Sequence, residues 1–373
     1  MTKKRICFIA QFPPPIHGLS KAVETLYDSP LQNEFDFERI NITNNYRFPE
    51  RLIKILISKA DLFYFTISQS KGGNLRDLII LRVIQAKHKK CVIHLHGGYY
   101  RHLVDRDLPA WQRKANYRAV SRADGAIVLS QSLRPIFEGM VSEEKIFVVP
   151  NCVDDACLIS DAEFEQKLTA LEHKKIWHVL YLSNFMKEKG YPKVLEMAKL
   201  EKQRVDAGAE KRFHFDFAGK FFKEADYRDF QNYISENQLQ KDVTYHGIVS
   251  GNAKRKLLKE CDIFVLLTRY RNEGQPISIL EAMGNGLYIL TTDQGGIPDI
   301  VKDGENGTVL TRPEETDLTA VLNRVHLTRE LMTRNRVTAK SRYSQRNYLE
   351  NMKNVFQISL TSGEGDSSCA SCS

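Results

Sequence analysis

Short apolar runs alternate with stretches of helical periodicity along most of this chain, and that alternation limits the folds it can adopt. Apolar runs separated by helices are typical of a parallel sheet whose strands are joined by crossover helices. A first series of expected strands comprises Ile6–Ala10, Asp61–Ile67, Cys91–Leu95, Ala126–Leu129 and Phe147–Val149. A second series comprises Trp177–Leu182, Phe213–Phe217, Val243–His246, Ile263–Leu267 and Leu287–Thr291. We therefore expect an α/β fold of two doubly wound, Rossmann-like parallel-sheet domains whose strand carboxyl ends face a central cleft.

The two series also set the expected domain boundaries. Residues 1–160 are expected to form the first domain and residues 173–345 the second, with a polar connection over about 152–175. With 373 residues and 42% hydrophobic content, the chain is large enough to bury two cores. Residues 361–373 are rich in Ser and Gly, and we expect a disordered tail there.

The cysteines and the apolar runs bear on where such a protein works. Seven cysteines are scattered and several fall in apolar runs, which suits a reducing compartment better than a disulfide framework. No run approaches the roughly 20 apolar residues of a membrane span. The run Ile6–Ala10 is too short for the apolar region of a signal peptide. Cys369 and Cys372 form a lone pair in the tail, where we expect neither a metal nor a redox role. These features predict a cytoplasmic localisation.

The net charge of +8, from 54 basic and 46 acidic residues, indicates anionic partners. No zinc spacing, aromatic RNA-binding stretch or helix-turn-helix pattern is present, so nucleic acid is not an expected partner. Basic residues are in local excess over Lys71–Lys90 and over Tyr99–Arg122, where aromatic residues are interleaved. Such a surface could rest on an anionic bilayer, or it could be an ordinary solvated helix face.

The segment Arg271–Glu281 places two carboxylates, Glu273 and Glu281, eight positions apart across a loop-to-helix junction. Pro276 suits the first helical position, so unpaired helix amides near Ser278 would be available to a phosphate. Carboxylates accept hydrogen bonds from hydroxyls, and a nucleotide-sugar carries both phosphate and hydroxyl groups. We expect Glu273→Ala to abolish the activity of this site and leave the fold intact, because a polar loop exposes its side chain.

Three further signals stand near expected strand ends. Gly18 follows a Pro-rich turn and could let a phosphate approach the backbone, although glycine and proline punctuate any strand-to-helix turn. His94 and His96 share a strand face, and we expect His96 in the cleft and His94 in a structural role. Lys189 follows the first strand of the second domain and is placed to meet a diphosphate, although a single surface lysine is usually only solvated.

Together these motifs resemble the large family of retaining, GT-B-fold glycosyltransferases with a Glu-x7-Glu pair, glycosyltransferase family 4. That family includes sucrose synthase and many bacterial polysaccharide transferases. The match extends over most of the chain. It comprises the turn ending in Gly18, His94-Leu95-His96-Gly97, Val149-Pro150-Asn151-Cys152-Val153-Asp154, Lys189-Gly190, Phe217-Ala218-Gly219, Tyr245-His246-Gly247-Ile248-Val249, Glu273 with Glu281, and Gly295-Gly296-Ile297-Pro298-Asp299.

The resemblance implies a role for each matching residue. Glu273 would contact the hydroxyls of the donor sugar and Glu281 the ribose of the nucleoside. Lys189 and the backbone at Gly18 would hold the diphosphate, and His96 would contact the donor sugar. The expected catalytic residues are therefore His96, Glu273 and Lys189. The expected donor-binding residues are Gly18, Asn184, Val249, Gly274, Gln275, Pro276, Ile277, Ser278 and Glu281.

The implied activity is a retaining, hexosyl-type transfer from a nucleoside-diphosphate-sugar, either a UDP-sugar or GDP-mannose, to a saccharide acceptor. The backbone of Val249 would meet the base, and a helix at 346–360 would cross back onto the first domain. No metal and no cofactor are expected, since no Asp-x-Asp pair stands near a strand end. Lys189 and backbone amides would instead stabilise the departing nucleoside diphosphate.

The basic and aromatic stretches of the first domain favour a lipid-linked saccharide as acceptor. The setting would be the assembly of a bacterial capsule, O-antigen or exopolysaccharide, with the protein in peripheral contact with the anionic inner face of the cytoplasmic membrane. A soluble acceptor is the alternative.

Three positions depart from the family pattern. Asn184 stands where the family usually has an arginine for the phosphates, His17-Gly18 replaces the usual Gly-Gly, and Asp299 takes a position commonly held by Glu. Other interpretations therefore stay open. One is a non-catalytic GT-B subunit that binds a nucleotide-sugar and supports a partner enzyme. A sugar-nucleotide epimerase or a phosphorylase is another, although the Glu273 and Glu281 pair favours a transferase.

Overall fold

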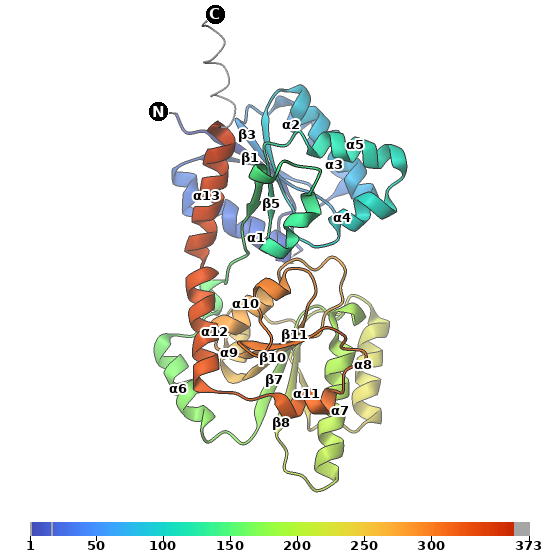
Figure 1. Cartoon of the computed structure of the whole chain (residues 1–373), viewed down its shortest axis with the longest axis vertical. Helices are drawn as coiled ribbons and strands as arrows, with labels where there is room; N and C mark the ends of the chain where they lie inside the picture. Colours follow the sequence, from blue (N-terminus) through green and yellow to red (C-terminus); the bar gives the residue numbers. More distant parts are fainter. Residues whose placement is uncertain (1, 16–17, 362–373) are drawn as a thin grey trace, which may run out of the picture. The chain divides into compact units, whose positions relative to one another are not determined.

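The computed structural model describes residues 2–15 and 18–361 (Figure 1). The chain forms two compact units: unit 1 contains Met1–Asn151 and Arg346–Ser373, and unit 2 contains Cys152–Gln345. Residues 152–160, expected at the end of the first domain, therefore fall in unit 2. The expected tail at 361–373 lies outside the described residues except for Thr361, as does His17 of the Pro-rich turn.

Unit 1 is built on a parallel sheet with the strand order β2-β1-β3-β4-β5-β6. Every residue of β3 and β5 is buried, as expected for a parallel sheet with helices on both faces. The strands are β1 (Arg5–Ala10), β2 (Asp36–Asn41), β3 (Leu62–Thr66), β4 (Lys90–His94), β5 (Gly125–Val128) and β6 (Ile146–Val148).

Helices flank this sheet, and those that contact its strands bury apolar residues. In α1, for example, Ala22, Val23 and Leu26 are buried at helical spacing. In α3, the side chain of Ser70 caps the first turn by accepting a hydrogen bond from the amide of Gly73. The helices are α1 (Gly18–Tyr27), α2 (Phe48–Ile57), α3 (Lys71–Ala86), the single turn α4 (Tyr100–His102), α5 (Ala110–Val120) and α13 (Gln345–Thr361).

The last helix, α13, completes the core of unit 1. The ring of Phe356 lies 6.2 Å from that of Phe8, 5.9 Å from that of Phe35 and 6.0 Å from that of Tyr64. One turn from its start, the hydroxyl of Tyr348 donates a hydrogen bond to the carbonyl of Ala22 at 3.3 Å. Residues from both ends of the chain thus share one core.

Unit 2 is a second parallel sheet with the order β12-β11-β10-β7-β8-β9. The chain builds outward from β7 to β9 and then crosses to the other side of β7 to start β10. The strand order therefore reverses between β7 and β10, which is the position where open α/β sheets bind ligands. The strands are β7 (Trp177–Leu182), β8 (Phe213–Ala218), β9 (Val243–Tyr245), β10 (Ile263–Leu266), β11 (Tyr288–Thr292) and β12 (Gly307–Leu310).

The helices of unit 2 begin in the segment that was expected to be a polar connection. Ser160 and Glu163 form a capping box at the start of α6, which explains why this polar stretch is helical. Arg336 of α12 is buried and donates to the carbonyl of Gly284 at 2.9 Å, which joins α12 to α10. The helices are α6 (Asp161–Leu171), α7 (Tyr191–Asp206), α8 (Glu224–Glu236), α9 (Gly251–Glu260), α10 (Ile277–Gly284), α11 (Leu318–Arg324) and α12 (Arg329–Arg342).

The ten strands predicted from apolar runs are confirmed, and the predicted fold class with them. Two further strands, β2 and β12, were not predicted. Both lie at sheet edges, where only part of each strand is buried. In β2 Ile40 alone is fully buried, so no apolar run marks it.

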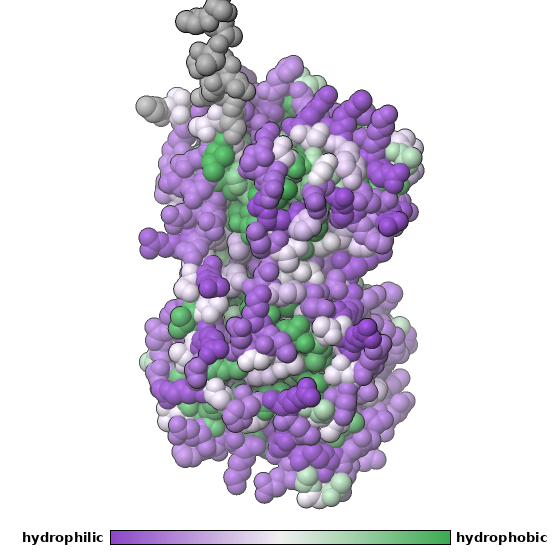
Figure 2. Space-filling model, in the orientation of Figure 1, coloured by the Kyte–Doolittle hydropathy of each residue, from purple (hydrophilic) through white to green (hydrophobic). Residues whose placement is uncertain are grey.

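Hydrophilic residues dominate the face seen in Figure 2, with apolar residues in small groups among them. None of the helices in the described part of the chain is long and apolar enough to cross a membrane.

Candidate functional site

The loops that follow β7 and β10 lie beside each other at the carboxyl ends of neighbouring strands. They carry Lys189 and Glu273, respectively. The ammonium of Lys189 lies 2.6 Å from the carboxylate of Glu273, whose same oxygen accepts a hydrogen bond from the hydroxyl of Thr268 at 3.1 Å. Lys189 also lies over the ring of Tyr270, 4.9 Å from its centroid. The structure thus brings together two of the residues predicted from sequence.

Gly190 allows the Lys189 loop to approach the end of β10. Its φ of +85° favours glycine, and a Cβ there would lie 2.3 Å from the carbonyl oxygen of Leu267. The amide of Arg269 donates to the carbonyl of Glu188 at 2.6 Å. The two loops are therefore joined through their backbones, which fixes Lys189 beside Glu273.

A third loop, after β11, packs on the other side of Glu273. Gly295 has a φ of +60°, and a Cβ there would lie 2.4 Å from the carbonyl oxygen of Glu273. The amide of Gly296 donates to the carbonyl of Gly274 at 2.7 Å. The packing of these two loops therefore requires the Gly295-Gly296 motif, whether or not a ligand is bound.

The expectation that the loop exposes Glu273 was wrong. Glu273 is 7% exposed, because the loops after β7 and β11 cover it on two sides and Lys189 pairs with its carboxylate. Removing this side chain would leave a nearly buried ammonium without its partner. Glu273→Ala is therefore expected to destabilise the protein rather than to leave its stability unchanged.

The second carboxylate of the pair, Glu281, is buried in α10 and binds Lys254 of α9. Lys254 Nζ lies 2.5 Å from Glu281 Oε1. Burial raises the pKa of Glu281, while the charge and hydrogen bond of Lys254 act in the opposite direction. Burial and the nearby Glu281 raise the pKa of the Cys157 thiol to about 12, so Cys157 stays neutral. Glu281 is thus a buried acceptor that is bound by the ammonium of Lys254 and by the thiol of Cys157.

The residues between the two carboxylates form the turn into α10. Pro276 stands one position before the first helical residue, Ile277, rather than at the first helical position. The side chains of Ile277 and Ser278 are half-buried, and Gly274, Gln275 and Pro276 are buried.

Asn184 and Val249 lie in the loops after β7 and β9. Both are half-buried, and the carbonyl of Asn184 accepts a hydrogen bond from the hydroxyl of Tyr181 at 2.9 Å. Between these loops, Gly219 has a φ of +149°, and a Cβ there would lie 1.9 Å from the carbonyl oxygen of Ser183. The Phe217-Ala218-Gly219 motif is therefore needed for the close approach of the loop after β8.

In unit 1, His94 ends β4 and is fully buried, and Tyr64 Oη lies 2.7 Å from His94 Nδ1. Burial and the neighbouring His96 lower the pKa of His94 well below its ordinary value, so its ring is neutral. The ring of His96 packs 3.9 Å from that of His94 and is half-buried. Gly18 opens α1 and is exposed, and a Cβ there would meet nothing within 4 Å. The roles of His96 and Gly18 stay predictions.

Sequence reasoning missed the partners of the two carboxylates. Lys254 is one of several basic residues on α9, and no spacing distinguishes it from Lys256 or Lys259. Thr268 and Tyr270 lie in the loop after β10, where only Glu273 belongs to a motif that the sequence analysis recognised.

Two family models match the chain. The model of glycosyl transferases group 1 matches residues 162–342, within unit 2. The model of glycosyltransferase family 4 matches residues 23–156, almost all of them in unit 1.

Curated relatives and solved structures are similar at low identity. AmsK of Erwinia amylovora, an amylovoran biosynthesis glycosyltransferase, is 25% identical over 171 residues, which are 45% of this chain and 40% of AmsK. MJ1607 of Methanocaldococcus jannaschii, an uncharacterized glycosyltransferase, is 23% identical over 310 residues, 78% of this chain and 72% of that protein. HepE of Anabaena in complex with UDP has a TM-score of 0.70 at 15% identity, over 95% of this chain and 99% of that chain. This likeness establishes the two-domain GT-B fold.

Proposed function

Because the chain contains a glycosyl transferases group 1 domain and a glycosyltransferase family 4 domain, we propose that it is a retaining glycosyltransferase. It moves a sugar from a nucleoside-diphosphate-sugar to a saccharide acceptor. The alignment with AmsK spans only 40% of that relative, so the activity rests on the site as well as on similarity.

The observation that carries the proposal is the pairing of Lys189 with Glu273 at the reversal of strand order between β7 and β10. The cation can bind a diphosphate while the carboxylate beside it accepts a hydrogen bond from a sugar hydroxyl. Glu281, held by Lys254, supplies a second acceptor for the hydroxyls of a ribose. A nucleoside-diphosphate-sugar presents a sugar, a diphosphate and a ribose, for which Glu273, Lys189 and Glu281 would be the respective partners.

In the proposed reaction, the bond between the sugar C1 and the diphosphate oxygen breaks, and a bond from an acceptor hydroxyl to C1 forms on the same face. The acceptor proton passes to an oxygen of the departing diphosphate. Lys189 stabilises the negative charge that develops on the leaving group, so the transfer needs no metal ion. Glu273 orients the donor sugar through its hydroxyls.

The donor and the product class are supported by the similar proteins. HepE was crystallised with UDP-glucose as well as with UDP, and that complex has a TM-score of 0.68 at 16% identity. AmsK acts in the biosynthesis of amylovoran. We infer a UDP-sugar as donor and the assembly of a bacterial surface polysaccharide as setting.

A surface patch of unit 1 supports a lipid-linked acceptor. The patch, which we name the α2–α3 patch, lies on α2, α3 and the residues that flank α2. Lys87, just after α3, donates a hydrogen bond to the carbonyl of Ile55 in α2 at 3.0 Å. Its large apolar side chains are all at least 39% exposed, and they are Tyr46, Ile53, Leu56, Ile57, Leu75 and Ile79. The exposed basic residues beside them in the chain are Arg47, Lys54, Lys59 and Arg82, of which Arg47 and Lys54 pair with Glu50.

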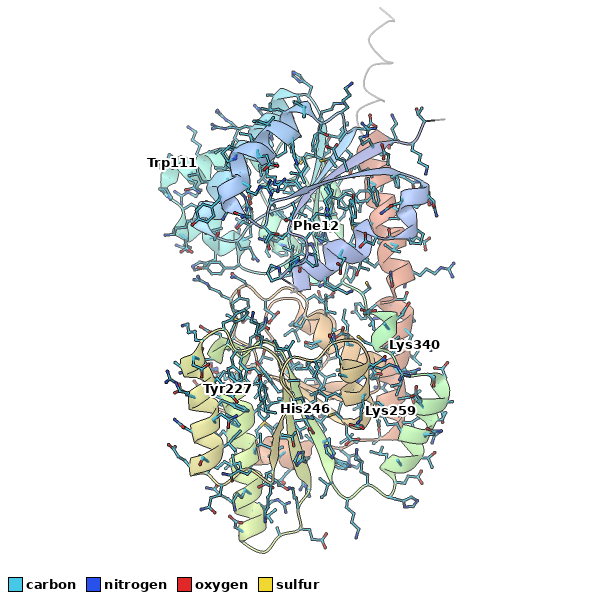
Figure 3. The ribbon with its side chains drawn as sticks, turned by 180° about the vertical axis from the view of Figure 1, so that it is seen from behind. Phe12, Trp111, Tyr227, His246, Lys259 and Lys340 are labelled. Atoms are coloured by element: carbon cyan, nitrogen blue, oxygen red, sulfur yellow. The ribbon has the colours of Figure 1, made fainter. Side chains whose placement is uncertain are left out.

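This combination favours peripheral binding to an anionic membrane, since apolar side chains enter the headgroup region while cations attract the lipid charge. The patch is centred on α2, which precedes both basic stretches singled out in the sequence. Trp111, from the second stretch, is also exposed, on α5 (Figure 3).

A thermal-shift screen with UDP, GDP, ADP, dTDP and their common sugar conjugates tests the donor site, because a ligand of the folded state raises the Tm. A shift with one nucleotide that is lost in Glu281→Ala is the expected result. Transfer is then assayed with that donor and a membrane extract as acceptor source, and release of the free nucleoside diphosphate is measured.

Asn184, in place of an arginine for the phosphates, favours one second candidate, a non-catalytic subunit that binds the nucleotide-sugar. The two candidates differ in the same experiments. Nucleotide binding without transfer to any acceptor fraction would support the subunit, whereas no binding of any nucleotide would contradict both.

A further inference from the structure

One face of the unit 2 sheet carries polar side chains where a covered parallel sheet is normally apolar. On β8, Phe213, Phe215 and Phe217 point to one face and pack in an aromatic cluster, with Phe217 5.4 Å from Phe230 of α8. His214 and Asp216 alternate with them and point to the other face. Packing of the core does not account for histidines and a carboxylate at these positions.

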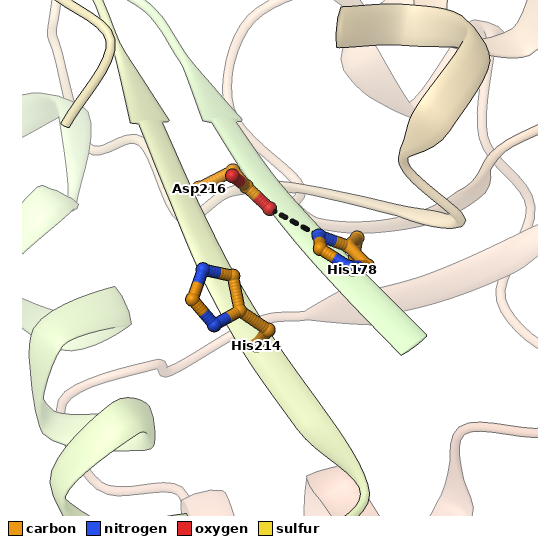
Figure 4. Close-up of side chains that lie close together, drawn as sticks. All are labelled: His178, His214 and Asp216. Carbon is orange, nitrogen blue, oxygen red and sulfur yellow. Dashed lines mark hydrogen bonds and ion pairs between the residues drawn. The ribbon is translucent and has the colours of Figure 1, made fainter. Parts of the chain in front are cut away.

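Three of these side chains converge (Figure 4). His178 of β7 and His214 of β8 are register partners in adjacent strands, and their rings lie 5.1 Å apart. Asp216 stands two residues along the same face of β8, and His178 Nδ1 lies 2.7 Å from Asp216 Oδ2. The candidate ligand atoms of the three residues all lie within 4.8 Å of one another.

A fourth residue orients the carboxylate. His246, just after β9, lies with Nε2 2.7 Å from Asp216 Oδ1, and it is labelled among the strands of unit 2 in Figure 3. The side chain of Asp216 is 6% exposed and that of His178 37% exposed. The carboxylate of the cluster is therefore buried against the sheet, and solvent reaches the cluster at His178.

We propose that His178, His214 and Asp216 form a binding site for a zinc-class divalent metal ion, with His246 as the residue that orients Asp216. Two imidazoles and one carboxylate, with water at an open fourth position, are a donor set that Zn²⁺ accepts. The hydrogen bond from a histidine to the free oxygen of a ligating carboxylate is the outer contact that such sites use.

The geometry requires a small local adjustment. Donor atoms about 2.1 Å from a tetrahedral ion lie roughly 3.4 Å apart, so the most distant pair has to close by roughly 1.4 Å. Rotation of the imidazole rings permits this, because the second side-chain torsion of histidine has a broad minimum. The hydrogen bonds between His178 and Asp216 and between His214 and Thr244 are exchanged for bonds to the ion.

The two histidine ligands lie away from the loop that carries Lys189. His178 and His214 are the second residues of β7 and β8, whereas the loops that carry Lys189 and Asn184 start after the last residue of β7, Leu182. Four residues of strand correspond to roughly 13 Å. An ion here would join β7 to β8 and stabilise unit 2.

Chelator-treated full-length protein tests the proposal, with zinc chloride and cobalt chloride as probes. All proteins carry Cys369→Ser and Cys372→Ser so that the thiols of the tail take no metal. Calorimetric titration with zinc is expected to give one ion per chain, and cobalt to give a visible absorption band of bound Co²⁺. Zinc is also expected to raise the Tm.

His214→Gln and Asp216→Asn are expected to weaken zinc binding at least a hundredfold, and His246→Gln ten- to a hundredfold. The matched control is His173→Gln, an exposed histidine just before β7, which is expected to bind like the parent. No binding to the parent would overturn the proposal. His214→Gln removes no buried charge, so the variant is expected to fold. Equal zinc affinity of His173→Gln and His214→Gln would therefore overturn the proposal as well.

Discussion

Lys189 and Glu273 stand 84 positions apart in the chain, yet Lys189 Nζ lies 2.6 Å from Glu273 Oε2. Their side chains are 15% and 8% exposed, so each charge depends on the other for stabilisation. A diphosphate at Lys189 and a sugar hydroxyl at Glu273 would each take over part of this pairing. The ion pair therefore stabilises the free protein, and the same two side chains are proposed to bind the donor in the complex.

Removing either partner of this pair is expected to destabilise the protein. Glu273→Leu and Lys189→Met each leave one nearly buried charge, at a cost of about 3 kcal/mol in the free energy of unfolding. The double variant is expected to lose less than the sum of the two, because no unpaired charge remains. Urea unfolding of the four proteins measures this coupling, and strictly additive losses would contradict it.

Lys254 is expected to keep nucleotide binding independent of pH near neutrality. Burial raises the pKa of Glu281 and Lys254 counteracts this, so Lys254→Met raises the pKa further. The variant then keeps a proton on Glu281 to a higher pH than the parent does, and its affinity for the nucleotide is expected to rise as the pH rises through this range. Its stability is expected to fall over the same range, because the folded state binds this proton more tightly than the unfolded state.

The control for this experiment is Lys256→Met, an exposed lysine on the same helix that pairs with Glu260. Calorimetric titrations at pH 6, 7 and 8 compare the three proteins. An affinity of Lys254→Met that does not change with pH, relative to the control, would argue against the role given to Lys254.

Substitutions at Gly190 and Gly208 separate two effects on stability: the close packing of the Lys189 loop and the strain of a positive φ. Both have a positive φ, +85° and +95°, but a Cβ at Gly208 would meet nothing within 4 Å. Gly208→Ala is expected to cost about 1–2 kcal/mol. Gly190→Ala is expected to cost roughly 2 kcal/mol more, because its Cβ displaces the backbone at Leu267. Equal losses of stability in urea would show that the two loops are not tightly joined.

The α2–α3 patch predicts salt-sensitive binding to liposomes that contain anionic lipid. Ile53→Ser with Ile57→Ser is expected to weaken binding about thirtyfold, since the pair contributes roughly 2 kcal/mol of apolar transfer. Val337→Ser, at an exposed apolar residue of unit 2, is the matched control. Sedimentation at low and high salt measures the effect. Binding that persists in the double variant would exclude this patch as the membrane surface.

The apolar runs were sufficient to predict most of the fold. A central strand of a parallel sheet is buried on both faces, so its sequence is apolar throughout, as in β5 and β10. The edge strands β2 and β12 lack that signal, and their pairing depends on neighbours far away in the chain. The polar segment that begins α6 resembles a connection, because the residues of its capping box are also common in loops.

Only those site residues could be predicted whose charged side chain and position after an apolar run are visible in the sequence. Lys189 and Glu273 follow apolar strands, so sequence alone places both at strand ends. Their burial has no such signal, because it comes from backbone contacts of Gly190 and Gly295 with distant loops. The convergence of His178, His214 and Asp216 was equally hidden, since strand register and not sequence spacing brings them together.

The chain leaves unit 1 after Asn151 and returns to it at Arg346, so a ribosome delivers α13 only after all of unit 2. At about 5–20 residues per second, the delay is roughly 10–40 s. During that time Phe8, Phe35 and Tyr64 lack the ring of Phe356 against which they pack. The unit whose synthesis begins first is thus the unit whose core is completed last, because its final helix is made only after the whole of the other unit.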